Sequence, residues 1–116
     1  MFSDRVKAVV GKARPTQTVA LIVCVAAKVD RGEVAAIADV SERRLYVDRF
    51  YSKAKQPLVR GMRSLTGVEI IDELEGTNQM VVAAPAGIWR KYLAHPPAVF
   101  KRRDLTVTPN ETEVIL

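Results

Sequence analysis

The side chains that could support catalysis are few in this sequence and lie far apart. The only histidine, His95, precedes two prolines, and the only cysteine, Cys24, lies in an apolar run that predicts a buried thiol. Asp72 and Glu73 are neighbours in a predicted strand, where they point to opposite faces and cannot pair as general acid and base. The sequence has no catalytic triad, cysteine metal site or glycine-rich phosphate loop. We therefore expect a protein that is not an enzyme, needs no cofactor or metal, and acts by binding.

Length and composition indicate one globular domain. The 116 residues suffice for one modest core, and 48% hydrophobic with 27% charged residues argues against disorder. The apolar run over 19–27 stops at Lys28, at roughly half the length of a membrane span. No signal peptide is recognisable before it. We therefore expect a cytoplasmic protein without a membrane segment, secreted only if a leader has been removed.

The net charge of +5 raises the question of an acidic partner. Basic residues are spread along the chain and acidic residues separate them, except at the triplet Lys101-Arg102-Arg103. A scattered excess is typical of a solvated surface, whereas a concentrated basic patch indicates nucleic acid. The triplet is therefore the candidate basic patch of this chain.

Hydrophobic periodicity predicts the elements that must position a binding surface. The first 16 residues predict a helix that Ser3-Asp4 caps and that runs through Ala13, before Arg14-Pro15 ends it. The β-branched run over 18–27 predicts a central strand covered on both faces.

Two helical stretches are expected before the middle of the chain. A short helix is expected over 33–40, and Ser41 begins a longer helical stretch that reaches Gly67. Pro57 is expected to kink or divide this stretch, because it lacks a backbone donor and clashes one turn back. Gly67 suits a left-handed residue that closes the helix.

The second half of the chain predicts a hairpin, a helix and a last strand. Strands are expected over 68–74 and 79–84, joined by a turn, and a helix is expected over 86–94. The last strand is expected over 99–107, before a polar tail. The predicted core includes Leu21, Val23, Ile70, Val81 and Val99, so an aspartate at position 81 would unfold the domain.

The order strand, helix, strand, strand, helix, strand predicts the α+β fold class. Two βαβ halves with right-handed crossovers give a four-stranded antiparallel sheet with both helices on one face. This is a ferredoxin-like sandwich, here with an extra N-terminal helix.

Three consecutive segments resemble a known family. The strand within Asn-Gln-Met-Val-Val-Ala-Ala-Pro (78–85) leads into the short helix Ala-Gly-Ile-Trp-Arg-Lys-Tyr-Leu-Ala (86–94). His-Pro-Pro-Ala-Val-Phe (95–100) then takes the place of an Asp-Pro-Ser-Val step into the last strand. In this order the segments resemble the second half of a subtilisin propeptide, an inhibitor I9-like domain. The resemblance divides the single domain into an N-terminal helical extension (1–16), a propeptide-like core (17–108) and a C-terminal tail (109–116).

The resemblance implies a domain that inhibits a subtilisin-like serine protease and assists its folding as an intramolecular chaperone. The open face of the sheet would pack on two surface helices of the enzyme, and the C-terminal tail would lie in the substrate cleft. Such a tail adds backbone hydrogen bonds to an enzyme edge while alternate side chains fill pockets. The tail residues are Glu113, Val114, Ile115 and Leu116, with Leu116 in the primary pocket.

The chain departs from the family where acidic residues cap the enzyme's helices. The corresponding stretch is Lys101-Arg102-Arg103-Asp104, so that Asp104 alone is suited to capping a helix. The basic triplet would repel the positive end of a helix.

The alternative function is a ferredoxin-like adaptor or nucleic-acid-binding module that uses a basic surface. A basic sheet face would favour it, but the paired strand aromatics of the common RNA-binding sheet are absent. The aromatic residues in predicted helices are Tyr46, Phe50, Tyr51, Trp89 and Tyr92.

Overall fold

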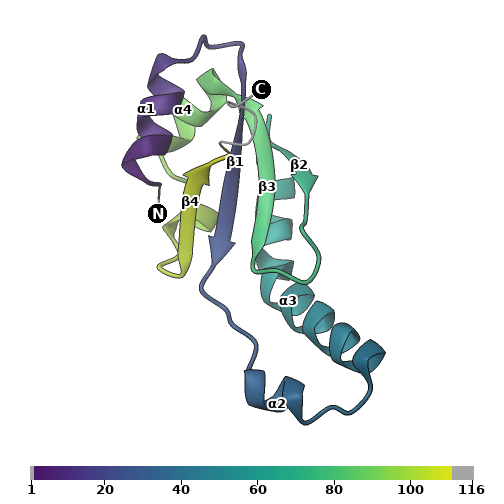
Figure 1. Cartoon of the computed structure of the whole chain (residues 1–116). Helices are drawn as coiled ribbons and strands as arrows, with labels where there is room; N and C mark the ends of the chain where they lie inside the picture. Colours follow the sequence, from purple (N-terminus) through teal and green to yellow (C-terminus); the bar gives the residue numbers. More distant parts are fainter. Residues whose placement is uncertain (1, 111–116) are drawn as a thin grey trace.

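The computed structural model describes residues 2–110, and its helices and strands alternate along the chain (Figure 1). In chain order they are α1 (Asp4–Lys12), β1 (Thr18–Val25), α2 (Arg31–Ala35), α3 (Val40–Arg63), β2 (Glu69–Asp72), β3 (Gln79–Pro85), α4 (Ala86–Ala94), the 3-10 helix η1 (Ala98–Lys101) and β4 (Leu105–Pro109). The predicted α+β class is confirmed.

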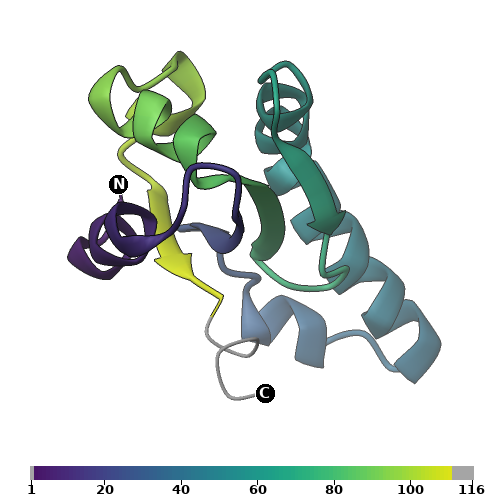
Figure 2. The same ribbon diagram turned by 90° about the horizontal axis from the view of Figure 1, so that it is seen from above.

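The strands form one four-stranded antiparallel sheet, as expected, in the order β2-β3-β1-β4. β1 lies between β3 and β4, so that Ile22 is opposite both Val81 and Thr108, and Val23 is opposite Val107. The connection from β1 to β2 passes β3, and the connection from β3 to β4 passes β1. In the view from above, the helical segments lie around this central sheet (Figure 2).

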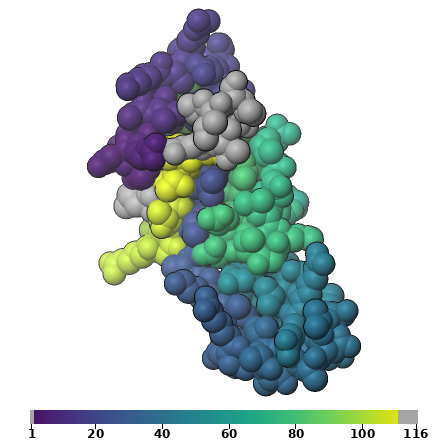
Figure 3. All heavy atoms as spheres, viewed as in Figure 1, coloured from purple at the N-terminus to yellow at the C-terminus, as the bar shows by residue number. Residues whose placement is uncertain are grey.

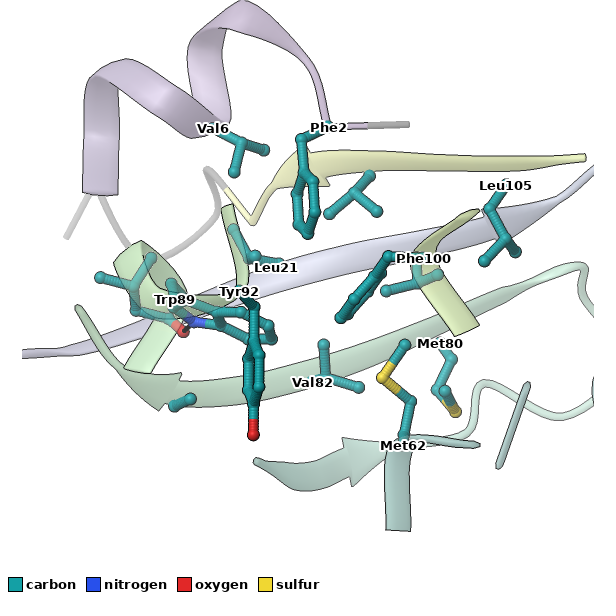
Figure 4. Close-up of a cluster of buried hydrophobic side chains, with 14 of the residues drawn as sticks. Phe2, Val6, Leu21, Met62, Met80, Val82, Trp89, Tyr92, Phe100 and Leu105 are labelled. Carbon is teal, nitrogen blue, oxygen red and sulfur yellow. Dashed lines mark hydrogen bonds between the residues drawn. The ribbon is translucent and has the colours of Figure 1, made fainter. Parts of the chain in front are cut away.

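The core forms against alternate residues of β1. Leu21 and Val23 are fully buried, as predicted, with Trp89 and Phe100 in the same cluster (Figure 4). Trp89 donates its indole N–H to the backbone oxygen of Val19, 2.9 Å away, which satisfies its one polar atom inside the core. The residues of β1 that alternate with these buried positions point to the other face and are only half-buried. The prediction of a strand covered on both faces was therefore wrong.

The prediction that Val81 belongs to the core was also wrong. Val82 and Met80 are fully buried, whereas Val81 is half-buried on the opposite face, where it pairs with Ile22. The error has a simple cause: β3 is apolar at every position from 80 to 84, so no alternation marks its inner side. Two further core residues that were predicted, Ile70 and Val99, are half-buried and pack against the cluster's edge.

The helical stretch before β2 is one element rather than two. α3 contains Pro57 without interruption, and its N-cap is Asp39, which accepts from the backbone N–H groups of Ser41 and Glu42. The short α2 covers 31–35 rather than 33–40. Gly67 has the expected left-handed conformation, with φ of +83°, but lies beyond the end of the helix.

The last strand begins later than predicted. Residues 98–101 form η1, and pairing with β1 starts only at Leu105. Phe100 explains the difference, because its ring enters the core beside Trp89 and Phe2, at centroid distances of 6.2 and 4.8 Å (Figure 4). A compact turn suits this inward position better than an extended strand.

The N-terminal helix is joined to the rest of the fold by polar contacts as well as by packing. Val6 and Val10 are fully buried. The guanidinium of Arg90 in α4 donates to the backbone oxygens of Val10, Gly11 and Ala13, at the end of α1. These carbonyls lack partners within the helix, so Arg90 satisfies them and places a positive charge at the negative helix end.

A close helix contact at Gly61 gives a first testable prediction. A Cβ atom added at Gly61 of α3 would lie 2.5 Å from Val99 Cγ2, whereas one added at Gly11 of α1 would meet nothing within 4 Å. Gly61→Ala should therefore lower the free energy of unfolding by about 1–2 kcal/mol despite its better helix propensity. Gly11→Ala, the matched control, should raise it by about 0.5–1 kcal/mol. Urea titrations of both variants would measure the difference, and a stabilised Gly61→Ala would contradict this packing.

Candidate functional site

The sheet has one face that faces away from the core, which we call the open face. The register of the strands identifies its residues, because paired residues of neighbouring strands point to the same side of the sheet. Ile22 and Val81 form one such pair on this face. Three of its strands, β4, β1 and β3, lie side by side at the surface in Figure 3. The open face comprises Ala20, Ile22 and Cys24 of β1, Gln79, Val81 and Ala83 of β3, Thr106 and Thr108 of β4, and Glu69 and Asp72 of β2.

The open face is apolar at its centre and has no basic residue. Ile22 and Val81 are half-buried, and Thr106 and Thr108 are exposed on the β4 side. None of the described strands contains a lysine or arginine, although the chain has 18 of them. A protein of net charge +5 therefore has a sheet face without positive charge, which suits an apolar partner better than a phosphate backbone.

Cys24 lies on the open face and is half-buried, so the prediction of a buried thiol was wrong. Asn78 donates its side-chain amide to Cys24 Sγ at 3.1 Å and to the backbone oxygen of Val25 at 2.8 Å. Asn78 thereby ties the end of the β2–β3 loop to β1. These two hydrogen bonds give Asn78 a structural role.

The candidate basic patch and the candidate helix-capping acid lie together between η1 and β4. Arg102 and Asp104 form an ion pair, with Nη2 and Oδ2 2.6 Å apart, and Arg102 also donates from Nε to Asp104 Oδ1. This guanidinium holds the pKa of Asp104 below its ordinary value. Lys101 and Arg103 are exposed. Of the four charged residues in this stretch, Arg102 and Asp104 are therefore already paired with each other.

The predicted protease-binding residues Glu113, Val114, Ile115 and Leu116 lie outside the described residues. Asn110, the last described residue, donates its backbone N–H to the backbone oxygen of Ala20 at 3.1 Å. Asn110 thus continues the pairing of β4 with β1. The tail starts from the sheet itself, beside the open face.

The residues first considered for catalysis are not brought together. His95 is exposed at the end of α4, and Asp72 Oδ1 accepts from the backbone N–H of Leu74. Glu73 lies after β2, 4.0 Å from a nitrogen of Arg63. Within residues 2–110, histidine, cysteine and carboxylate side chains nowhere gather in a group of three that could hold a metal ion. Among the same residues, no helix combines the length and apolar character that crossing a bilayer requires.

Sequence reasoning missed Lys55, which is the buried charged residue of α3. Its side chain is 3% exposed, and its ammonium donates to the backbone oxygens of Glu73, Leu74 and Gln79. Burial lowers the pKa of Lys55, while nearby carboxylates oppose that change. The signal was present, since Lys55 shares a helical stripe with the core residues Leu58, Val59 and Met62.

Lys55 fixes the loop between β2 and β3. Its three acceptors come from both ends of this loop, which also includes Leu74 and Gly76 in left-handed conformations, with φ of 48° and 77°. The ammonium therefore supplies the partners that such an irregular backbone lacks within the sheet. Lys55 thereby joins this loop to α3.

Comparison of the chain with protein-family models, with characterised proteins and with solved structures finds no significant match.

Proposed function

We propose that this chain is a propeptide-like binding domain that inhibits a subtilisin-like serine protease and assists its folding. The observation that carries the proposal is the open face, an apolar sheet surface without positive charge on a basic protein. In this arrangement the open face packs on the surface of the protease. The end of the C-terminal tail, residues 113–116, enters the substrate cleft.

The ferredoxin-like sandwich is part of the same proposal. Two features support it: the antiparallel sheet, and two crossovers that each pass one strand. The buried residues of α3 and α4 join one cluster with alternate residues of β1 and β3. The residues between them are half-buried, apart from the buried Ala83. A sheet covered by helices on one face leaves the other available to a partner.

The residue types on the open face favour a protein partner over nucleic acid. Phosphate binding requires lysine or arginine at the contact, and these are lacking on the described strands. Lys101 and Arg103 lie in the connection before β4, and Arg102 is paired with Asp104. The candidate basic patch at 101–103 thus keeps two exposed side chains, Lys101 and Arg103, which lie outside the sheet.

Deleting Val114, Ile115 and Leu116 tests the role assigned to the tail. Because buried aliphatic side chains contribute about 1.5–3 kcal/mol each, the deletion should weaken inhibition by about three orders of magnitude or more. The fold should persist, because the core residues lie between 2 and 107. Inhibition constants for the full and shortened chains against several subtilisin-like proteases would measure the effect. Equal inhibition by both chains would show that the tail is not a substrate mimic.

A further inference from the structure

We infer that the exposed side of α3 binds a single-stranded nucleic acid by its phosphate groups. This surface lies on a helix and not on the open face, so it is separate from the surface that the proposed function uses. Two features mark it: a row of positive charges along α3, and a hollow with aromatic side chains at one end of this row. The row, which we call the basic stripe, comprises Arg49, Lys53, Gln56, Arg60 and Arg63.

Helical spacing places the basic stripe on one side of α3. Its members stand at positions i, i+4, i+7, i+11 and i+14, and all of them are exposed. The buried positions of α3, from Lys55 to Met62, lie on another side of the helix. At about 1.5 Å per residue, the stripe is about 21 Å long. Residues 49–68 include no aspartate or glutamate. Charges that look scattered in the sequence therefore form one continuous row.

The charges of the basic stripe have few partners within the described part of the chain. Arg49, Lys53 and Arg60 make no hydrogen bond or ion pair with the other described residues. Arg63 is 4.0 Å from a carboxylate oxygen of Glu73, and both side chains are at least half exposed. Like charges three or four residues apart on a helix repel each other. A polyanion bound along α3 would relieve this repulsion.

A hollow beside the first charges of the stripe favours a single strand as the polyanion. The hollow has a volume of about 570 Å³, and Tyr46 and Phe50 line it together with Arg49 and Lys53. Its other lining residues are Ile37, Glu42 and Leu45. Aromatic rings beside positive charges are the combination by which proteins hold unpaired bases and the phosphates between them. A duplex keeps its bases stacked inside, and an acidic polypeptide has no bases to stack.

The hollow and the basic stripe are open to a long partner. The first half of α3 extends beyond the sheet, next to α2 (Figure 1). Every buried residue of α3 lies at Lys55 or later in the helix, and Leu45 in the hollow is 52% exposed. Leu45 and Arg49 are four residues apart and therefore share a side of the helix. A strand can thus pass from the hollow onto the stripe.

Equal losses of charge at two places test the basic stripe. Lys53→Gln/Arg60→Gln removes two of its charges, and Lys101→Gln/Arg103→Gln removes the same residue types from the connection before β4. Fluorescence anisotropy with a labelled oligothymidylate would give the dissociation constant of each chain. The first variant should bind about tenfold more weakly or worse at about 50 mM salt, and the second within about threefold of the wild type. Circular dichroism would confirm that both variants are folded.

Salt dependence counts the phosphate contacts. For three or four contacts, the slope of the logarithm of affinity against the logarithm of salt concentration should be about −2 to −3 in the wild-type chain. The stripe variant should have a slope smaller in magnitude by about 1.4, because two contacts are lost. Phe50→Leu should weaken binding to the oligothymidylate about fivefold or more and leave the salt slope unchanged, since stacking is not ionic.

Four results would overturn the inference. The wild-type chain could fail to bind the oligothymidylate at low salt, or the two double variants could lose affinity equally, which would reduce the effect to net charge. A loss confined to Lys101→Gln/Arg103→Gln would place the contact before β4. Competition by polyglutamate or by a DNA duplex as strong as that by unlabelled oligothymidylate would show that the partner is not a single strand.

Discussion

Val82→Lys should abolish cooperative folding, whereas Val81→Lys should leave the domain folded. The two residues are adjacent in β3, but Val82 is fully buried and Val81 is half-buried on the open face. An unpaired charge in the core costs several kcal/mol, which is comparable to the whole stability of a small domain. At position 81 a lysine can extend into solvent and keep only its methylene stem on the sheet.

Thermal unfolding followed by circular dichroism would compare the two variants directly. The expected result is no cooperative transition for Val82→Lys and a transition within a few degrees of the wild type for Val81→Lys. Unfolding of the position-81 variant with a folded position-82 variant would mean that the faces of β3 are assigned the wrong way round.

Lys55→Met should lower the free energy of unfolding by about 2–3 kcal/mol, because it removes the ammonium that bonds three carbonyl oxygens. Methionine fills a similar volume, so the loss reports mainly the polar contacts. Lys53→Met, two residues away on the exposed side of α3, should stay within about 0.5 kcal/mol of the wild type.

Denaturant titrations give both values, and amide hydrogen exchange gives the location. Exchange should accelerate in the loop over 73–78 of Lys55→Met while the core strands remain protected. Equal stability of the two variants would show that the buried lysine does not fix this loop.

Local patterns predicted the elements whose ends are marked by particular residues. The helix over 86–94 was correctly bounded, because Pro85 precedes it and His95 with two prolines follows it. Of the predicted capping pair Ser3-Asp4, Ser3 is the N-cap of α1, where its hydroxyl oxygen accepts from the backbone N–H of Val6. These signals act within one turn of chain and need no tertiary partner.

The features that the sequence did not reveal depend on partners distant in the chain. The inner side of β3 is decided by its register with β1, because the strand itself is uniformly apolar. The bulge at Ile71 appears only when β2 pairs with β3. Phe100 leaves the extended conformation because Trp89 and Phe2 complete its pocket. Lys55 could be noticed as a charge in an apolar stripe, but its acceptors lie 18 to 24 residues away.

The most direct test of the proposed function is a titration of purified subtilisin-like proteases with the intact chain, with Val81→Lys as the folded control. The account predicts that the wild-type chain inhibits at least one of them competitively and at one-to-one stoichiometry. It also predicts that Val81→Lys, which places a charge at the centre of the open face, inhibits at least tenfold more weakly. Absence of inhibition by the wild-type chain, or equal inhibition by the two, would contradict the claim that the open face docks on the protease.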